Sequence, residues 1–513
     1  MDPLHLVDLL ACLVLGYVLY KLCTARKLRL PPGPRGLPII GNIYNVPKRD
    51  EWIAYRDMAQ QYNSDIIHLN LMGTSLIVIN SREAARELFD KRSAIYSDRR
   101  VEPPYHMLNG LMGFTWHFAF HRYGASWKEH RKLFHKEFVG SVVTSHYPRL
   151  LDGSRVLLQK LLNDPKNFRE TLRFVAARII LGVAYGIDVR DYSDYYVQTA
   201  ENAMTGMAAA GNAGSFLVDS FPILRHIPDW FPGAGFKKKA ANWSLSVKAM
   251  PRVPMKFVHD SIAAGTASYS IASKHLAEIG EHHEHLSEKV ELLGNVLAAS
   301  YAGKTVSTLS TFILAMTQNP EIQAKAHEAI DNAIGRDRLP EFEDYKSIPY
   351  INAIHNEVLR WRAVTPLAVP HSVSQDDEYR GYHIPKDSIV VGNTWAMLND
   401  VSVYGEDPDS FNPDRWLKDG VMNPDIPHPE EAFGFGRRIC PGQEMAEASM
   451  WMSIASILAV FDITKAVDDK GNAIEPSGEF TSGLLSHPVP FQCEIKPRSK
   501  YAISLIQSGI HVL

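Results

Sequence analysis

The sequence predicts a mainly α-helical protein with a smaller β portion, preceded by one N-terminal transmembrane helix. Three observations lead to this prediction. An apolar run over residues 4–22 is long enough to cross a bilayer as a helix. Short alternating stretches between residues 52 and 89 are typical of strands that lie between helices. From about Val156 helical periodicity prevails, and strand patterns return near residues 389–391 and at the C-terminal end.

The bulk composition excludes some classes of function. The chain has 513 residues, and its 54 Lys and Arg nearly balance its 57 Asp and Glu, for a net charge of −3. A broad basic field is therefore lacking, and we expect no nucleic-acid partner. Only four cysteines occur, Cys12, Cys23, Cys440 and Cys493. So few cysteines argue against a disulfide framework and fit a reducing compartment.

The N-terminal apolar run is predicted to anchor the protein in a membrane. Its leucines and valines outweigh the cost of the single Asp8, which lies near one end. Lysines and arginines at residues 21–29 follow the run and should stay cytosolic, together with the bulk of the chain. The alternative, a cleaved secretory peptide, requires positive charge before the run and a small-residue cleavage site after it, and neither is present. We expect residues 1–30 to form the anchor and its basic flank.

A proline-rich segment separates this anchor from the rest of the chain. Residues 31–34 read Pro-Pro-Gly-Pro, and prolines fix their own φ angle and bias the preceding residue away from helix. Residues 31–50 are therefore predicted to form a stiff hinge. Neither an internal repeat nor a break in composition divides residues 51–513, which we expect to form one large catalytic domain.

The segment at residues 433–442, FGFGRRICPG, carries the strongest chemical signal. It presents one thiol, Cys440, on a loop in which Gly434 and Gly436 allow tight backbone geometry. A cysteine thiolate can bind haem iron and donate electron density to it. Pro441 suits the first turn of a following helix, whose N-terminal end favours an anionic sulfur. The alternative is a turn that merely contains a core cysteine.

This segment resembles the cysteine-ligand signature of the cytochrome P450 family: an aromatic residue, a glycine, an arginine, the cysteine and a final glycine. The resemblance implies that Cys440 is the axial ligand of the iron of haem b and that Arg438 pairs with a haem propionate. Phe433 is expected to cover the sulfur. The resemblance extends over essentially the whole chain and implies the cytochrome P450 fold, with residues 51–513 as a haem-thiolate catalytic domain.

Further partners of the haem propionates are expected on one helix and directly after Pro370. Trp127 and Arg131 lie four residues apart on a single helical face, from which an indole N–H and a guanidinium can bind carboxylates. The resemblance adds His371 as a third candidate. The family often has arginine where this chain has Lys128, and lysine keeps the charge but loses the planar fork. Without the cysteine segment, an amphipathic surface helix would explain the same pattern.

A buried ionic network is expected beside the haem-binding core. Glu357 and Arg360 lie three residues apart on one face of a helix predicted over residues 350–361. Arg415, in the sequence FNPDRW, supplies a second cation. The resemblance implies a Glu–Arg–Arg network with a structural rather than a catalytic role, and removal of one member would leave a buried charge unpaired.

The oxygen-activating helix departs from the family pattern. We expect one long buried helix over residues 292–316, in which the family usually places an acid followed by a threonine. Here Gly303 and Lys304 precede Thr305, and no carboxylate stands before that threonine. Three explanations remain open: a short piece lost at an exon junction, proton delivery by water and Thr305 alone, or a protein with weak, uncoupled or altered chemistry. General acid assistance is typically worth 10²–10⁴-fold, so its loss matters without forbidding turnover.

The substrate pocket is expected to be mostly apolar, as suits a lipophilic small molecule. By resemblance, the pocket draws on four segments: residues 111–116, 214–217, 364–369 after the Glu–Arg helix, and 483–487. The candidate pocket residues are Phe114, Trp116, Leu217, Val364, Leu367 and Leu484.

The resemblance therefore implies a monooxygenase, fungal and microsomal in type, that inserts one oxygen atom from O₂ into a lipophilic molecule of secondary metabolism or detoxification. The chain lacks a flavin or dinucleotide fingerprint, so electrons should come from NADPH through a separate flavoprotein reductase. The expected location is the endoplasmic reticulum membrane, with one span and a cytosolic catalytic domain. Because of the altered Gly303-Lys304 region, two alternatives stay open: a haem-thiolate isomerase or dehydratase, and a degenerate haem-binding protein with weak turnover.

Overall fold

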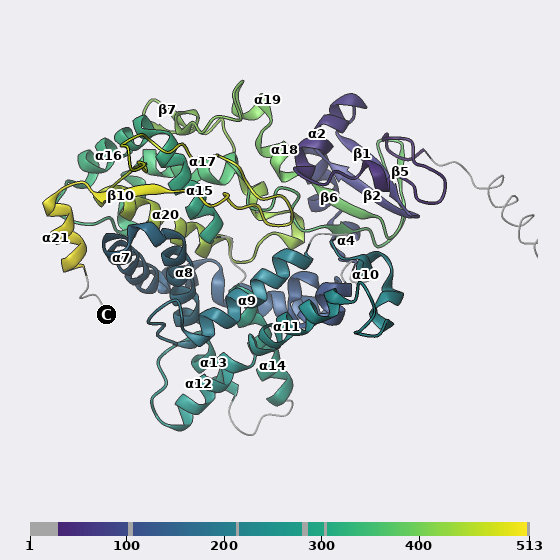
Figure 1. Ribbon diagram of the computed structural model, residues 1–513, viewed down its shortest axis with the longest axis horizontal. Coiled ribbons are helices and arrows are strands. Elements are labelled where there is room, and N and C mark those ends of the chain that lie inside the picture. The colour runs from purple at the N-terminus through teal and green to yellow at the C-terminus, as the bar shows by residue number, and fades with distance from the viewer. Residues whose placement is uncertain (1–28, 101–105, 212–214, 280–285, 302–304, 510–513) are drawn as a thin grey trace, which may run out of the picture.

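The computed structural model describes residues 29–100, 106–211, 215–279, 286–301 and 305–509 (Figure 1). The predicted transmembrane helix lies outside these residues, apart from the last two positions of its basic flank. Within the described ranges, no helix is both long and apolar enough to cross a bilayer. The described chain is mainly helical with a smaller β portion, as the sequence predicts.

The main sheet lies at one end of the molecule, beside helix α2 (Glu51–Gln61) (Figure 1). Its strand order is β1-β2-β6-β3, in which β1 and β2 form an antiparallel hairpin and β6 pairs parallel with β2. Three of these strands confirm the alternating stretches predicted from the sequence. The four strands are β1 (Ile66–Leu71), β2 (Thr74–Ile79), β6 (Ile389–Gly392) and β3 (His371–Ser372).

Three further strand pairs complete the sheets of the described residues. The strand pair β9 (Phe461–Lys465) and β10 (Cys493–Pro497) joins the C-terminal region to the end of helix α20. The other pairs are β4 (Asp377–Tyr379) with β5 (Tyr382–Ile384), and β7 (Leu417–Lys418) with β8 (Val421–Met422).

Helices fill the rest of the molecule (Figure 1). Their apolar faces form one large core with Phe138, Phe312 and Trp451 fully buried in it. α20 is buried on almost every side and is accordingly apolar all round. The longer helices are α5 (Ala125–Phe138), α7 (Tyr147–Asn163), α8 (Phe168–Tyr185), α9 (Tyr195–Ala210), α11 (Gly235–Ala249), α12 (Val253–Ala263), α13 (Ile271–Ile279), α14 (Leu286–Ser300), α15 (Thr305–Gln318), α16 (Pro320–Ile334), α17 (Pro349–Trp361), α20 (Gln443–Val460) and α21 (Lys500–Ser508).

Shorter helical segments connect these elements. They are η1 (Ile43–Asn45), α3 (Arg82–Ala85), η2 (Arg86–Lys91), α4 (Ser93–Tyr96), η3 (His106–Leu111), η4 (Phe114–Trp116), η5 (Phe118–Phe120), α6 (Ser141–Ser145), η6 (Pro165–Asn167), α10 (Leu217–Ser220), η7 (Pro222–His226), η8 (Phe342–Lys346), α18 (Thr394–Leu398), α19 (Val401–Tyr404), η9 (Pro413–Trp416), η10 (Glu430–Phe433) and η11 (Gly436–Arg438).

The single helix predicted over residues 292–316 is wrong. α14 ends at Ser300, Tyr301 is a turn residue, and the next described residue, Thr305, belongs to a separate helix, α15. The physical reason lies in the last turn, where the N–H of Tyr301 donates to the carbonyl of Ala298, three residues back (3.2 Å), instead of continuing the α-helical pattern. Gly303 and Lys304 lie outside the described residues.

Candidate haem-binding site

The loop that carries Cys440 is held by backbone contacts from both sides. The N–H of Cys440 donates to the carbonyl of Phe433 (2.8 Å), which closes the loop onto its own start. Gly436 adopts φ +53°, and a Cβ atom there would clash with the carbonyl of Phe89. Only glycine meets both requirements without strain. Pro441 lies two residues before α20, so it precedes the helix rather than occupying the predicted first turn.

Aromatic side chains fix this loop against the rest of the protein. Phe433 is buried in a cluster of hydrophobic side chains to which the half-buried Cys440 also belongs. Phe435 stacks on Phe89, with ring centroids 5.0 Å apart, and Phe89 in turn contacts the ring of His371 at 4.4 Å. The predicted thiol ligand and the predicted histidine partner are thereby connected through two phenyl rings.

Helix α5 contacts the same loop through the two residues predicted on its face. Arg131 donates from Nη1 to the carbonyl of Ile439 (2.6 Å), directly beside Cys440. Burial lowers the pKa of Arg131, while the neighbouring Cys440 acts in the opposite direction. Trp127 lies one turn earlier on α5. The guanidinium of Arg438 lies over its ring, 4.4 Å from the ring centroid. The structure thus brings these predicted residues together.

Arg438 is buried and surrounded by backbone carbonyls. It is 8% exposed and donates to the carbonyls of Ser97 and His121, both at 2.8 Å. Burial, followed by the charge of Arg99, lowers the pKa of Arg438 to about 8. His371 donates from Nδ1 to the carbonyl of Tyr96 (2.7 Å), and burial holds the pKa of His371 well below its usual range.

This donor set fits haem b. Within the described ranges, the hydrogen bonds of Arg438 and Arg131 go to backbone carbonyls and none goes to a carboxylate. Buried cations need nearby negative charge, which two propionates would supply. The thiol of Cys440 offers the sulfur ligand that iron requires.

Three histidines near this site were missed by the sequence analysis. His117 and His130 are buried, and the Nε2 atom of each has no hydrogen-bond partner in the part of the chain that the structure describes. His121 lies between them, with its ring 4.9 Å from that of His130. Burial lowers the pKa of all three imidazoles, to about 4 for His117. Three histidines within fourteen positions, directly before and within the Trp127 helix, were the available signal.

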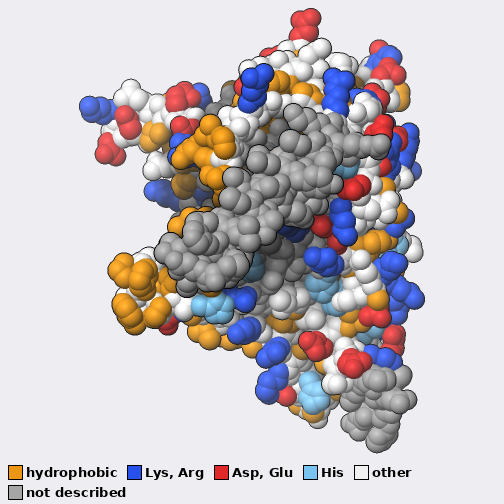
Figure 2. All heavy atoms as spheres, turned by 90° about the vertical axis from the view of Figure 1, so that its right-hand side faces the viewer, with side chains coloured by type: hydrophobic (Ala, Val, Ile, Leu, Met, Phe, Trp, Pro, Cys, Tyr) orange, Lys and Arg blue, Asp and Glu red, His pale blue; other side chains and the backbone are white. Residues whose placement is uncertain are grey.

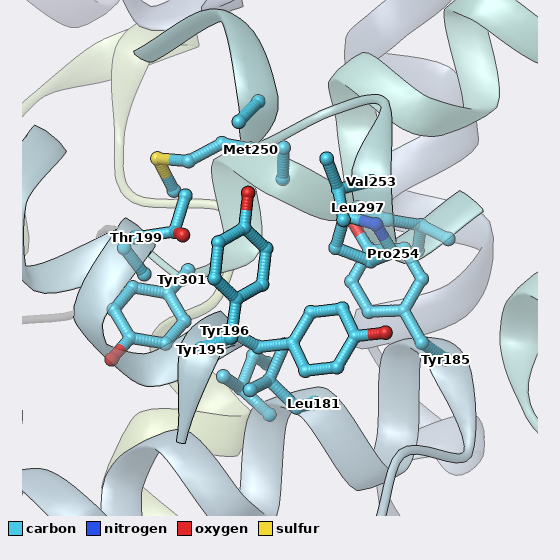
Figure 3. Close-up of a pocket in the computed structure, with 14 residues that line it drawn as sticks. Leu181, Tyr185, Tyr195, Tyr196, Thr199, Met250, Val253, Pro254, Leu297 and Tyr301 are labelled. Carbon is cyan, nitrogen blue, oxygen red and sulfur yellow. The ribbon is translucent and has the colours of Figure 1, made fainter. Parts of the chain in front are cut away.

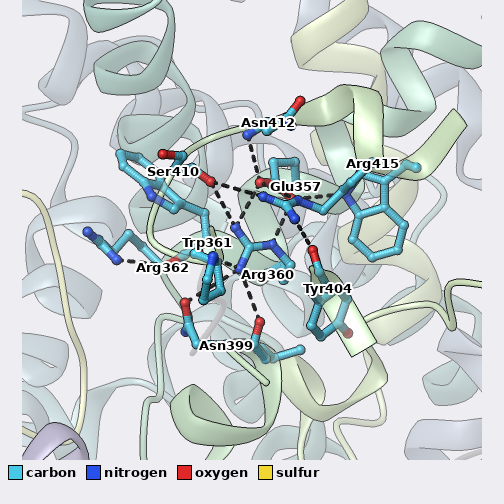
Figure 4. A network of polar contacts seen from close by, with 12 residues as sticks. Glu357, Arg360, Trp361, Arg362, Asn399, Tyr404, Ser410, Asn412 and Arg415 are labelled. Carbon is cyan, nitrogen blue, oxygen red and sulfur yellow. Dashed lines mark hydrogen bonds and ion pairs between the residues drawn. The ribbon is translucent and has the colours of Figure 1, made fainter. Parts of the chain in front are cut away.

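The predicted Glu–Arg–Arg contacts are confirmed (Figure 4). Glu357 and Arg360 are both 0% exposed and form a bidentate pair, with N–O distances of 2.7 and 2.8 Å. Arg415 donates from Nε to the same carboxylate at 3.3 Å. The sequence analysis missed two further donors, Trp416 Nε1 (2.9 Å) and the backbone N–H of Asn412 (2.8 Å). Glu357 therefore joins α17 to the segment that contains η9.

Comparison with known proteins decides the family. The Cytochrome P450 family model matches residues 31–495. The chain belongs to the cytochrome P450 family. The cytochrome P450 monooxygenase eriA of Hericium erinaceus is 45% identical over 493 residues, which cover 95% of this chain and 92% of that protein. Cytochrome P450 monooxygenase 98 of Postia placenta is 42% identical over 499 residues, or 96% of this chain and 95% of that protein.

A third relative of this P450 is the tryptamine 4-monooxygenase of Psilocybe cyanescens. The two sequences are 36% identical over 507 residues, which cover 96% of this chain and 98% of that protein. Together the family and its fungal relatives make this P450 a haem-thiolate monooxygenase, an oxidoreductase that incorporates oxygen from O₂.

The predicted pocket residues of this P450 do not all lie together. Phe114 is fully buried, and the half-buried Trp116 packs in the same cluster and donates to the carbonyl of Val247 (3.1 Å). Val364 is buried, and its carbonyl accepts from the N–H of Ser486 (2.8 Å). The half-buried Leu484 packs against Gly211 at the end of α9.

The structure contradicts one pocket prediction, Leu217, and shows the packing partners of another candidate, Leu367. Leu217 is 70% exposed, which is incompatible with the wall of a buried pocket. It opens the four-residue helix α10, which has too little length to bury all its apolar side chains. Leu367 packs against the sheet and against the cluster that contains Trp52 and Trp395. The apolar side chain indicated burial, which Leu217 does not show, and it did not indicate the packing partners of Leu367.

A small cavity lies between α8, α9, α12 and α14 (Figure 3). Its volume of about 20 Å³ is room for roughly one water molecule, so it does not hold a substrate. Tyr185, Tyr196 and Tyr301 line it. Tyr301 also donates to Glu201 Oε1 (3.2 Å), which ties the end of α14 to α9. Burial raises the pKa of Glu201.

Thr305 is half-buried and is the first residue of α15. Two residues later, the hydroxyl of Ser307 donates to the carbonyl of Ser486 (2.7 Å), which fixes the start of α15 against the C-terminal loop. Within the described part of the chain, the helix places no carboxylate in its first turn.

Proposed function

We propose that this P450 inserts one oxygen atom into a lipophilic small molecule of fungal secondary metabolism or detoxification. The observation that carries the proposal is the half-buried Cys440 on a fixed loop, beside the buried Arg438 and the half-buried Arg131. Haem b, when bound, supplies the oxygen-activating chemistry. The relative named tryptamine 4-monooxygenase acts, by that name, on tryptamine, which supports a small-molecule substrate here.

Each site residue then has a defined role toward the cofactor. Cys440 binds the iron, and Phe433 covers the sulfur and keeps water from it. Arg438, Arg131 and His371 bind the propionates, with Trp127 packed under the guanidinium of Arg438. Hydrogen bonds within the protein already fix the side chains of Arg438, Arg131 and His371. Little further ordering of these side chains is therefore needed when haem binds.

The network of Glu357, Arg360 and Arg415 has a structural role in this proposal. It holds α17 against the chain segment that precedes the Cys440 loop. Thr305 assists proton delivery from the start of α15 and is the only catalytic side chain proposed. Because no acid precedes it in the sequence, water must complete the path.

Electrons are proposed to come from NADPH through a separate flavoprotein reductase. The exposed lysines at 128, 132 and 136 recur every four residues on α5, the helix that also carries Trp127 and Arg131. Such a basic stripe complements an acidic partner surface and would speed its association.

The protein is proposed to lie on the endoplasmic reticulum membrane, with its catalytic domain in the cytosol. The apolar run at residues 4–22 provides the single span, residues 1–30 the anchor with its flank, residues 31–50 the hinge and residues 51–513 the catalytic domain. Figure 2 shows hydrophobic groups along one edge of the face that it draws. Large hydrophobic side chains are exposed within residues 37–44 and in the α10–α11 region. They are Leu37, Ile39, Ile43, Tyr44, Leu217, Phe221, Ile223, Trp230 and Phe231.

The test uses the full chain in vesicles with a flavoprotein reductase, NADPH and isotopically labelled O₂. A panel of lipophilic compounds is first screened by spectral titration of the ferric protein. The proposal expects a product that carries one labelled oxygen atom and forms only with NADPH and reductase. A product formed without reductase would favour the isomerase or dehydratase alternative. Consumption of NADPH that yields only peroxide would favour the degenerate alternative, to which the missing acid before Thr305 points.

A further inference from the structure

Asn109 is a buried polar residue whose hydrogen-bonding capacity is entirely unused. It lies on η3, is 3% exposed, and among the described residues neither its Nδ2 nor its Oδ1 has a hydrogen-bond partner. Buried side-chain amides are almost always hydrogen-bonded, and an unmet group costs the free energy of its desolvation. An unpaired donor and an unpaired acceptor on one side chain therefore require an explanation.

The surroundings of Asn109 offer apolar contacts. η3 packs against α9, α10, α11 and η4 (Figure 1 labels the three helices). Its neighbours in the sequence, Met107 and Leu108, are fully buried in a hydrophobic cluster that also contains Phe114 and Met207. A polar side chain in such a place is retained at a cost, and a ligand that restores its hydrogen bonds offsets that cost.

The same cluster extends to the candidate haem site. It contains Ala298 from the last turn of α14, and the partly buried Tyr301 and Val369 pack against it. Val369 lies two residues before His371, and its carbonyl accepts from Arg99. Asn109 thus belongs to the apolar wall that runs from η3 to the residues proposed to hold the propionates.

The position of η3 does not depend on Asn109. A carboxylate oxygen of Asp219, from α10, accepts from the N–H of Met107 (2.8 Å) and holds the start of η3. Because this clamp uses the backbone of η3, the amide of Asn109 is left over for another partner.

We propose that Asn109 is a specificity-determining residue that hydrogen-bonds a hydroxyl group of an otherwise apolar substrate, so that the preferred substrates are lipophilic alcohols. A hydroxyl is both a donor and an acceptor and can satisfy Oδ1 and Nδ2 together. A carbonyl can accept only from Nδ2, and a hydrocarbon satisfies neither atom. This inference rests on the proposed function, since it assumes that the wall faces the substrate.

The first experiment measures binding without turnover. The ferric, haem-loaded full chain and its Asn109→Leu variant are titrated with cyclododecanol and cyclododecane, and with 1-dodecanol and dodecane, and the haem spectrum reports each dissociation constant. Leucine keeps the number and branching of the heavy atoms of asparagine but removes both polar ends. The preference for alcohol over hydrocarbon is expected to fall about tenfold in the variant, with hydrocarbon binding unchanged or tighter. An unchanged preference overturns the proposal.

The second experiment measures the thermal midpoint of the ligand-free proteins. Asn109→Leu should raise the midpoint by about 1 °C or more, because it removes an unpaired buried amide. Asn352→Leu is the matched control: Asn352 is also buried, but its Nδ2 donates to the carbonyl of Tyr345 (2.9 Å) and its Oδ1 accepts from Trp451 (2.7 Å), so the midpoint should fall.

A fall for Asn109→Leu comparable with that control overturns the proposal, whatever the titration gives. The carbon monoxide spectrum of the wild type is recorded alongside. A normal thiolate spectrum with an unchanged alcohol preference refutes only the role of Asn109, whereas an absent thiolate spectrum refutes the proposed function.

Discussion

Replacing Glu357 by glutamine should destabilise this P450 more than almost any other single neutralisation. The carboxylate accepts from Arg360 (2.7 and 2.8 Å), Arg415 (3.3 Å), Trp416 (2.9 Å) and the backbone of Asn412 (2.8 Å). The variant keeps the shape but turns one acceptor oxygen into a donor NH₂ and leaves two guanidinium groups without a counter-charge. Breaking a buried pair in this way typically costs about 3–5 kcal/mol, which is a large part of the 5–15 kcal/mol that stabilises a typical protein.

The assay is denaturant-induced unfolding, followed by helical circular dichroism, together with the haem content of the purified protein. Glu328→Gln is the matched control, because Glu328 is exposed on α16, and this change should alter the free energy of unfolding by less than about 0.5 kcal/mol. If Glu357→Gln unfolds within about 1 kcal/mol of the wild type, the network does not brace the fold and the reasoning fails.

Three other changes test single residues, two in the Cys440 loop and one on α20. Gly436→Ala should cost at least about 2 kcal/mol and reduce the haem content, because φ +53° strains an alanine and its Cβ would meet the carbonyl of Phe89. Burial raises the pKa of Glu447 from 4.5 to about 7. The folded state therefore holds a proton that the unfolded state has lost, and stability relative to Glu447→Gln should fall by up to about 3 kcal/mol as the pH rises from 4.5 to 7. Arg438→Lys should speed haem transfer to an acceptor protein about tenfold, because lysine lacks the planar fork.

Each of these changes has a control or a contradicting result. Gly442→Ala should be tolerated, because its Cβ would meet only the ring of Phe134 at an ordinary 3.7 Å. A pH-independent stability difference for Glu447→Gln, measured by denaturant unfolding, would contradict the assigned titration. Arg437→Lys, whose side chain contacts the hydroxyl of Tyr123, should leave the rate of haem loss unchanged. An equal effect of the two arginine changes would show that the buried position of Arg438 does not determine haem retention.

Local sequence signals predicted the parts of the site that depend on neighbours in the chain. The spacing of Glu357 and Arg360 on one helical turn, and of Trp127 and Arg131 on another, was enough to predict which side chains share a face. The glycines of the Cys440 loop likewise indicated a backbone that other residues cannot adopt. These predictions hold because helix geometry and φ preferences are properties of a few adjacent residues.

The sequence could not predict contacts between distant segments. Leu217 and Leu367 are as apolar as Phe114, yet one is exposed and the other packs against the sheet, because side-chain type does not specify a packing partner. Asn412 and the unused amide of Asn109 were missed for the same reason. The end of α14 at Ser300 depends on a backbone bond that no residue type in that stretch requires.

The most direct test of the account concerns the sulfur of Cys440. The full chain is reduced, treated with carbon monoxide and examined for the red-shifted Soret band of thiolate ligation. The account predicts this band in the wild type and its loss in Cys440→Ser. A wild type without the band, or a serine variant that keeps both the band and substrate oxidation, would contradict it.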